Sequence, residues 1–202
     1  MIKIIEVKNR KDRKEFLNFP LRMYKDNPNF VPPLYADEKK MFTKKFAYND
    51  TCESAFFLAE KDGKTVGRIS AIIQKAANEK NNEKRVRFTR FDCIDDEEVA
   101  KALFDAIEEY AAKNGMDTIC GPLGYSDLER EGLLIEGFDE LSTFEEQYNA
   151  EYYGRLIEAC GYKKEVDWVE SISFSSRRKR YRKHKKDVRL CEEQIRAKAS
   201  EV

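Results

Sequence analysis

The segment 121–148 and the residues directly after it carry the side chains best suited to bind a substrate. They combine phenols, a hydroxyl, an amide, a carboxylate and a guanidinium: Tyr125, Ser126, Asp127, Arg130, Asn149, Tyr152 and Tyr153. Connections of this length are often functional, and this one follows a predicted central strand, where α/β sheets place their ligands. These seven residues are our candidates for substrate binding. The alternative is a structural flap whose Leu133, Leu134 and Ile135 enter the core, with Tyr152 and Tyr153 as ordinary core and surface residues.

The histidine and cysteine content excludes most other kinds of site. His184 is the only histidine, which excludes a Ser-His-Asp triad and a histidine-rich metal site. The five cysteines are Cys52, Cys93, Cys120, Cys160 and Cys191. They are scattered and form no CxxC pair, so we expect neither a zinc site nor a disulfide framework. A general base would have to be a carboxylate, a tyrosine or a water molecule, and no catalytic residue is assigned.

A strand-helix-strand unit over Val86–Pro122 must position these candidates. The strand VRFTRFDCI is followed by the helix DDEEVAKALFDAIEEYAAKNG and the strand MDTICGP. Asp95 is the predicted cap, with Glu98 at the spacing of a capping box, and Asn114-Gly115 ends the helix. One helix face is apolar, formed by Val99, Leu103, Ile107 and Tyr110. A crossover of this kind predicts two parallel strands.

The residues before this unit predict a small antiparallel sheet. Ile2–Val7 is a first strand, and Asn9 caps a short helix that Pro20 ends. The proline-rich arm 27–34 is extended, either packed on the body or covering a ligand. Asp62-Gly63 joins the apolar runs 56–60 and 65–73 into a β-hairpin, and the polar residues 75–84 form a solvated loop.

The residues after the long connection predict one more helix and one more strand. Asn149 caps the helix AEYYGRLIEAC, which Gly161 ends, and 162–174 forms the last strand with Val166, Trp168 and Val169 packed. The predicted fold class is therefore α/β (α+β). Its mixed sheet has an antiparallel N-terminal meander followed by the central βαβ unit, with helices on both faces.

This order of elements resembles the GNAT superfamily of N-acetyltransferases. Several phrases are similar to a bacterial GNAT-like family whose members are about twice this length, of which residues 1–172 match the N-terminal half. They are NPNFVPPLYADEKKMF (27–42), AFFLAEKDGKTVGRISAIIQ (55–74), DCIDDEEVAKALFDA (92–106), GPLGYSDLEREGLLIEGFDEL (121–141) and DWVE (167–170). The resemblance implies a GNAT-like acyltransferase domain which, if active, transfers acetyl from acetyl-CoA to an amine.

The same resemblance implies where acetyl-CoA would bind. A GNAT enzyme places the diphosphate on a loop like Arg/Gln-x-x-Gly-x-Gly/Ala at the start of the central helix. The corresponding stretch, 91–98, has no glycine and contains Asp92, Asp95, Asp96, Glu97 and Glu98. Five carboxylates repel a diphosphate. We therefore expect no cofactor in this chain. Ile157 occupies the position of the family's usual tyrosine, the residue that protonates the leaving thiolate.

The C-terminal segment 175–202 differs in character from the rest of the chain. It contains 11 Lys and Arg against 4 Asp and Glu, whereas the other 174 residues contain 27 against 34. We divide the chain into a GNAT-like domain (1–174) and a basic tail (175–202), non-native or disordered. The tail has three interpretations: a nucleic-acid contact, a solvated tail without a role, or the product of a frameshift.

Three functions follow from these patterns. The first is a truncated or degenerate acyltransferase lobe without independent acetyl-CoA-dependent activity; the second is an active N-acetyltransferase; the third is a non-catalytic binding lobe or a tail-mediated nucleic-acid binder. The expected partner is a missing C-terminal GNAT-like half or a second copy of the chain. The chain has no signal peptide and no long apolar run, which predicts a cytoplasmic protein without membrane contact.

Overall fold

The computed structural model describes residues 1–143 and 146–169. Met1–Glu165 forms one compact unit, and the description of the fold concerns this unit. Its elements are β1 (Ile2–Glu6), α1 (Arg10–Met23), α2 (Tyr35–Lys40), β2 (Cys52–Lys61), β3 (Lys64–Gln74), α3 (Lys75–Asn81), β4 (Arg85–Cys93), α4 (Glu97–Lys113), β5 (Thr118–Cys120) and α5 (Tyr153–Ala159).

The strands form one mixed sheet in the order β1-β2-β3-β4-β5. β1 to β4 are antiparallel neighbours, whereas β4 and β5 are parallel, as the strand-helix-strand unit predicts. Asp62 and Gly63 both have positive φ in the turn between β2 and β3, the geometry that the Asp-Gly hairpin requires. The predicted fold class and the antiparallel meander are therefore confirmed.

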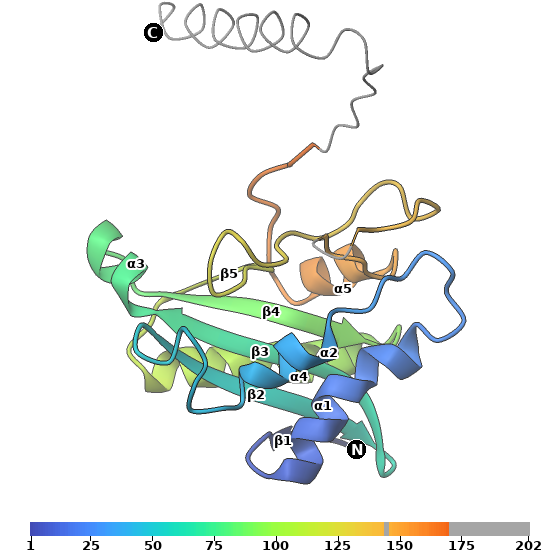
Figure 1. The fold of residues 1–202 in the computed structure, drawn as a ribbon, viewed down its shortest axis with the longest axis horizontal. Coiled ribbons are helices and arrows are strands. Elements are labelled where there is room, and N and C mark those ends of the chain that lie inside the picture. Colours follow the sequence, from blue (N-terminus) through green and yellow to red (C-terminus); the bar gives the residue numbers. More distant parts are fainter. Residues whose placement is uncertain (144–145, 170–202) are drawn as a thin grey trace, which may run out of the picture. The chain divides into compact units, whose positions relative to one another are not determined.

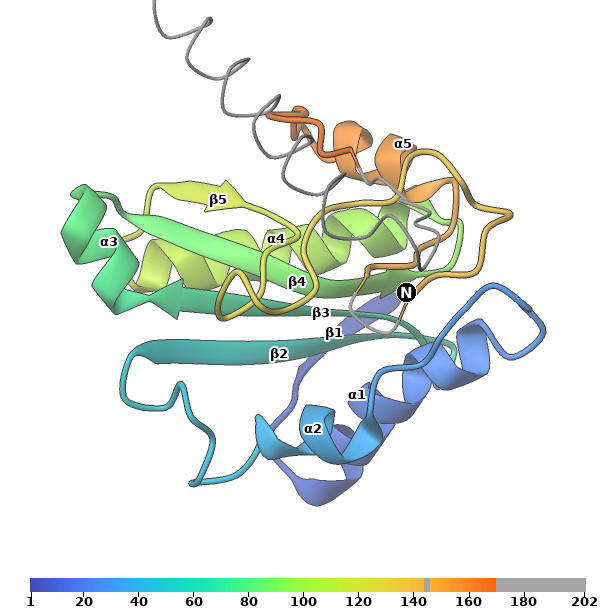
Figure 2. The same cartoon turned by 45° about the horizontal axis from the view of Figure 1, so that its top comes forward.

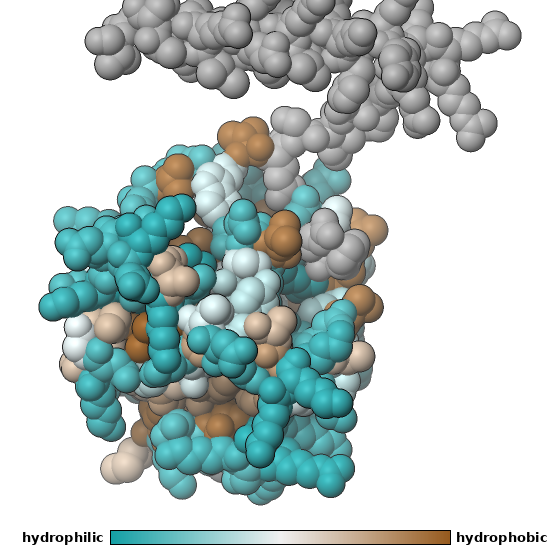
Figure 3. Space-filling view, turned by 60° about the vertical axis from the view of Figure 1, so that its left-hand side comes forward, coloured by the Kyte–Doolittle hydropathy of each residue, from teal (hydrophilic) through white to brown (hydrophobic). Residues whose placement is uncertain are grey.

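Helices cover both faces of the sheet (Figures 1 and 2). Side chains alternate along β2, so that Phe57 and Ala59 join the core under α4 while Phe56 and Leu58 join the core under α1. α4 packs closely on β3 at Gly67. A Cβ added at this glycine would lie only 2.8 Å from Leu103 Cδ1 of α4. Outside these cores the face shown in Figure 3 is mainly hydrophilic, as expected for a chain with 38 % charged residues.

Four predictions about helix boundaries and loops were wrong. Pro20 does not end α1, which continues to Met23. The cap of α4 is Asp96 rather than Asp95, since Asp96 Oδ1 accepts hydrogen bonds from the backbone N–H groups of Glu98 and Val99. Residues 75–81 form a helix with no buried residue, which Gln74 caps by accepting a 2.7 Å hydrogen bond from Ala77 N.

The fourth error concerns Asn149, which caps no helix. α5 begins at Tyr153 without a side-chain cap, and the buried Asn149 side chain instead bonds both backbone groups of Leu134.

The predicted last strand is also wrong over the residues that the structure describes. Residues 162–169 contain no strand. Val166, Trp168 and Val169 are 60 %, 60 % and 88 % exposed, so the apolar pattern that suggested a packed strand is not buried. Residues 170–174 and the basic tail lie outside the described residues.

Candidate functional site

A pocket of about 230 Å³ opens on the face of the sheet that carries α1 and α2. It is lined by Pro20, Phe30, Pro33, Leu34, Asp37, Glu38, Arg68, Thr89, Arg90, Asp92, Leu128, Glu129, Arg130, Gln147 and Tyr148. The pocket lies beside the end of β4 that β5 does not reach, at Thr89, Arg90 and Asp92. β5 pairs with β4 only at Arg85–Arg87, and Leu123 N bonds Phe88 O directly after it, so among the described residues no strand pairs with the last part of β4 on that side. A register shift with positive φ at Arg90 bends the strand there.

A buried ion pair forms the floor of the pocket. Arg68 Nε donates a 2.7 Å hydrogen bond to Asp92 Oδ2, and both side chains are less than one-tenth exposed. Burial raises the pKa of Asp92, although the charge of Arg68 acts to lower it. The expectation that Asp92 lies with the carboxylates at the start of α4 is therefore wrong, because the alternation along β4 turns Asp92 to the opposite face of the sheet, where it pairs with Arg68.

Tyr24 and Tyr153 support this floor from behind, through Asp92. The Tyr24 hydroxyl lies 3.1 Å from Asp92 Oδ1 and 2.7 Å from the Tyr153 hydroxyl. Tyr153 also accepts a 3.0 Å hydrogen bond from Cys93 N, while Tyr152 donates a 2.7 Å hydrogen bond to Cys93 O. Burial raises the pKa of both Tyr152 and Tyr153. These two phenols bind the edge of β4 where β5 does not reach it, and they remain protonated.

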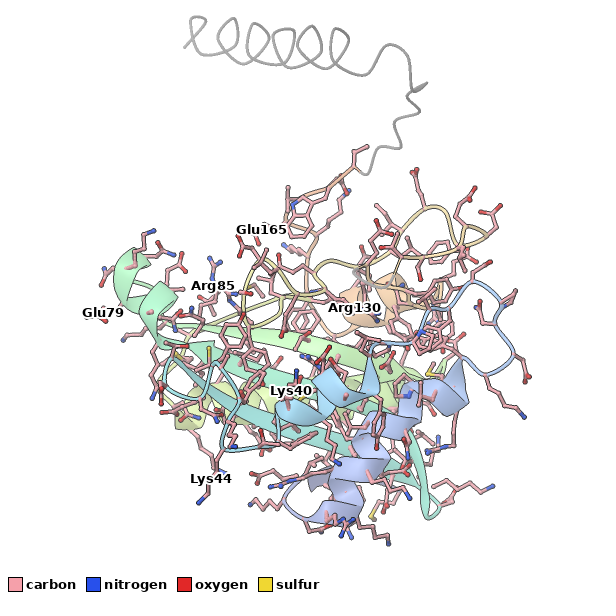
Figure 4. The ribbon with its side chains drawn as sticks, in the orientation of Figure 1. Lys40, Lys44, Glu79, Arg85, Arg130 and Glu165 are labelled. Atoms are coloured by element: carbon pink, nitrogen blue, oxygen red, sulfur yellow. The ribbon has the colours of Figure 1, made fainter. Side chains whose placement is uncertain are left out.

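A second, partly buried ion pair forms the wall. Arg90 donates two 2.9 Å hydrogen bonds to the carboxylate of Glu38 and lies 3.7 Å from Glu129 Oε2. Burial alone would raise the pKa of Glu38, but the charge and hydrogen bonds of Arg90 outweigh burial and lower it. Arg130, labelled in Figure 4, donates a 3.4 Å hydrogen bond to Val31 O of the arm. Charged groups thus line the inner pocket and apolar residues line its mouth.

Of the seven candidates from the sequence, only Arg130 lines this pocket. Tyr153 reaches it through Asp92, and Tyr152 lies beside Tyr153 with ring centroids 5.2 Å apart. Tyr125 is buried and bonds Ser54, and Ser126 bonds Tyr48, so both hold the loop to the body. Asp127 is exposed. A role of any of these residues in substrate binding stays a prediction.

The sequence analysis missed most of the charged residues of the pocket. Arg68, Arg90 and Asp92 each stand inside an apolar strand, where an unpaired charge is costly. That pattern was a usable signal for a buried ionic site. Glu38 gave no comparable signal, because it belongs to the polar run of α2 and is brought to Arg90 only by the tertiary fold.

The start of α4 is occupied by the chain's own side chains. Asp96 bonds the N–H groups of Glu98 and Val99, and Lys61 Nζ lies 2.7 Å from Asp96 Oδ2. Arg155 of α5 forms ion pairs with Asp95 and Glu97. Hydrogen bonding to Lys61 lowers the pKa of Asp96, so this carboxylate remains charged at neutral pH.

Solved structures share this architecture. The tandem GNAT protein from the clavulanic acid biosynthesis pathway aligns with 80 % of this chain and 43 % of its own chain, at a TM-score of 0.52 and 13 % identity. An aminoglycoside acetyltransferase from a soil metagenome aligns with 87 % of this chain and 97 % of its own, at a TM-score of 0.51 and 12 % identity. A predicted acetyltransferase from Clostridium acetobutylicum, solved with acetyl-CoA, aligns with 85 % of this chain and 96 % of its own, at a TM-score of 0.50 and 13 % identity. The chain has the GNAT fold.

Curated relatives are more similar in sequence. Protein YghO of Escherichia coli is 34 % identical over 173 residues, and the bacterial ceramide synthase of Caulobacter vibrioides is 32 % identical over 169 residues. The matches cover 83 % and 82 % of this chain but 44 % of each relative. The chain therefore spans less than half the length of these relatives. No protein-family model matches the sequence.

The start of α4 does not fit the diphosphate of acetyl-CoA. A helix end binds phosphate through free N–H groups and an unopposed positive dipole. Here the Asp96 carboxylate accepts hydrogen bonds from two of those N–H groups, and the four carboxylates of residues 95–98 outnumber the two cations that the described residues place beside them, Lys61 and Arg155. Among the described residues no group of three or more His, Cys, Asp or Glu side chains is arranged to hold a metal ion, and no helix is long and apolar enough to cross a membrane.

Proposed function

We propose that this chain is the acceptor-binding lobe of a two-lobed N-acyltransferase and does not itself hold the acyl-CoA donor. The observation that carries the proposal is a contrast between two places in the fold: the pocket has room for a ligand, whereas the start of α4 has none for a diphosphate. The pocket beside α1 and α2 is open to solvent at its mouth and is lined in part by charged groups. The helix end that would take a diphosphate is filled by Asp96 and its neighbours.

The pocket suits an amine. Among the described residues four carboxylates line it against three guanidinium groups, so the lining carries a small excess of negative charge. Asp37 is paired with Lys40 outside the lining, whereas Asp92, Glu38 and Glu129 each lie beside a guanidinium. Of these three, Glu129 has the longest ion pair and the most exposed side chain: its Oε2 accepts a 3.2 Å hydrogen bond from Tyr125 N and lies 3.7 Å from Arg90, and the side chain is 26 % exposed. An ammonium group that enters can pair with Glu129. That carboxylate can then accept the proton that the nitrogen loses before it acts as a nucleophile.

The mouth of the pocket suits an apolar extension of that amine. Phe30, Pro33, Leu34 and Leu128 line it, and Leu34 and Leu128 are 62 % and 89 % exposed. The name of the Caulobacter relative, bacterial ceramide synthase, supports the same substrate class, since a ceramide is an N-acylated long-chain amine. We extend this to the present chain as an acceptor whose ammonium enters the pocket while its hydrocarbon chain lies across Leu34 and Leu128.

Calorimetric titration tests the proposal. Octylamine should bind saturably to the intact chain, and octanol, which has the same hydrocarbon but no charge, should bind at least about tenfold more weakly, which is about 1.4 kcal/mol. Glu129→Gln should remove the preference for the amine. Glu136→Gln is the matched control, because Glu136 is an exposed glutamate of the same loop that does not line the pocket. Equal binding of octanol and octylamine would reject the acceptor site.

A second titration tests the absence of a donor site. Acetyl-CoA should give no saturable heat with the intact chain. Saturable binding that Asp96→Ala strengthens would show that the start of α4 holds the diphosphate. The proposal that the acyl-CoA donor binds to another lobe would then be wrong.

A further inference from the structure

Two segments without regular structure lie together beside the pocket. The arm 27–34 and the loop after β5 are joined by hydrogen bonds: Ser142 N donates to Asn29 O at 3.3 Å, and Asn29 Nδ2 donates to Phe138 O at 3.2 Å. Phe30 stacks on Tyr24 with ring centroids 4.6 Å apart and also contacts Tyr148. Both views show the two segments side by side (Figures 1 and 2). The surface that they form is therefore held in place from several sides.

This surface exposes large apolar side chains. Leu34 of the arm and Leu128, Ile135 and Leu141 of the loop are 62 %, 89 %, 54 % and 67 % exposed. Single exposed leucines are ordinary on proteins, but several on two joined segments indicate a surface that becomes covered. We call these four residues the apolar rim. The two segments that carry them are held by hydrogen bonds of Asn29 to Phe138 O, Asn149 to Leu134 N and Arg130 to Val31 O. A partner that covers the rim therefore has to order little additional backbone.

We infer that the apolar rim is the docking surface for a second GNAT-type lobe. The inference rests on the proposed function for one step, namely the need for a donor from outside this chain. The length of the relatives points to the occupant: the chain matches 44 % of both curated relatives and 43 % of a tandem GNAT protein. More than half of each relative is thus outside the match. A lobe of that size, seated on the rim, covers the pocket mouth at Leu34 and Leu128.

Two members of the rim separate docking from acceptor binding. Leu34 and Leu128 line the pocket, whereas Ile135 and Leu141 do not. A ligand in the pocket changes the exposure of the first pair, and a docked lobe changes the exposure of all four. Ile135 and Leu141 are therefore the reporters for the second lobe.

Hydroxyl-radical footprinting tests the inference. The reference sample is the present chain alone. The test sample is a chimera in which this chain takes the place of the 173 residues that it matches in YghO. Linkage in one polypeptide makes docking intramolecular, so a weak affinity between the halves of two relatives does not hide it. Ile135 and Leu141 should be oxidised at least about threefold more slowly in the chimera, while Leu21 of α1, which lies outside the rim, should react equally in both.

Charge substitutions at the rim complete the test. Leu141→Lys in the chimera should restore the oxidation of Ile135, and Leu21→Lys should leave it unchanged. Equal oxidation of the rim in the chain alone and in the chimera would overturn the inference. So would protection in the chain alone that grows with its concentration, which indicates a second copy, or protection only by phosphatidylglycerol vesicles, which indicates a membrane. Loss of octylamine binding with rim protection retained rejects the acceptor site and leaves the docking surface standing.

Discussion

Arg68 donates a 2.8 Å hydrogen bond to the backbone carbonyl of Phe16, the carbonyl that Pro20 leaves without a donor. In an α-helix the N–H of residue 20 would bond the C=O of residue 16, and proline has no N–H. The guanidinium supplies the missing hydrogen bond from the sheet and lies over the Phe16 ring, 4.9 Å from its centroid. This contact explains why α1 continues past Pro20, and it ties the helix to the floor of the pocket.

Arg68→Leu should destabilise the fold by about 3–5 kcal/mol, because it leaves Asp92 as a buried charge without its partner. The double variant Arg68→Leu with Asp92→Leu should cost clearly less than the sum of the two single changes. Urea unfolding monitored by circular dichroism measures both free energies. Arg22→Leu is the control, since the Arg22–Glu15 pair is on the surface and should contribute at most about 1 kcal/mol. An Arg68→Leu variant as stable as Arg22→Leu would contradict the network.

Asp96→Ala should cost about 0.5–2 kcal/mol, the usual effect of removing a helix cap. Asp95→Ala should cost less, because Asp95 forms only a surface pair with Arg155. Thermal unfolding of the two variants separates Asp96, which caps α4 here, from Asp95, which the sequence favoured. A larger loss of stability for Asp95→Ala than for Asp96→Ala would show that Asp95 caps α4, as the capping-box spacing predicted.

The Glu38–Arg90 pair should make stability depend on acidity. The pKa of Glu38 is lower in the folded chain than in the unfolded chain. Such a carboxylate adds stability above its unfolded pKa, and that stability is lost as the pH falls through its folded pKa. Between about pH 6 and about pH 3, the free energy of unfolding should therefore fall more steeply for the wild-type chain than for Glu38→Gln. Glu79→Gln, on exposed α3, should keep the wild-type slope.

Gly67→Ala should destabilise the chain by about 1–3 kcal/mol, because the added methyl lies 2.8 Å from Leu103 Cδ1 in a core without room for it. Gly154→Ala in α5 should be neutral or slightly stabilising, since its nearest neighbour would be 3.9 Å away and alanine favours the helix. Denaturant midpoints of the two variants measure the difference. Equal midpoints would show that α4 can move away from β3.

The sequence was most informative where a local pattern decides the structure. The hairpin at Asp62-Gly63, the apolar face of α4 and the parallel β5 all follow from short-range periodicity and turn chemistry. Prediction failed where a residue distant in the sequence makes the hydrogen bond that a local pattern assigns to a neighbouring residue. Arg68 overrides the stop signal of Pro20, and Asn149 bonds Leu134 instead of capping a helix. The pocket belongs to the second kind, because Glu38 and Arg90 are 52 residues apart.

The tyrosine hydroxyls on Cys93 have a consequence for solubility. Strand edges in most sheets are shielded by another strand, by charges or by a bulge. At Cys93 the edge of β4 is instead shielded by the hydroxyls of Tyr153, the first residue of α5, and of Tyr152, directly before it. Replacement of both Tyr152 and Tyr153 by phenylalanine removes only those atoms, yet it leaves the end of β4 open to pair with the same strand of another molecule.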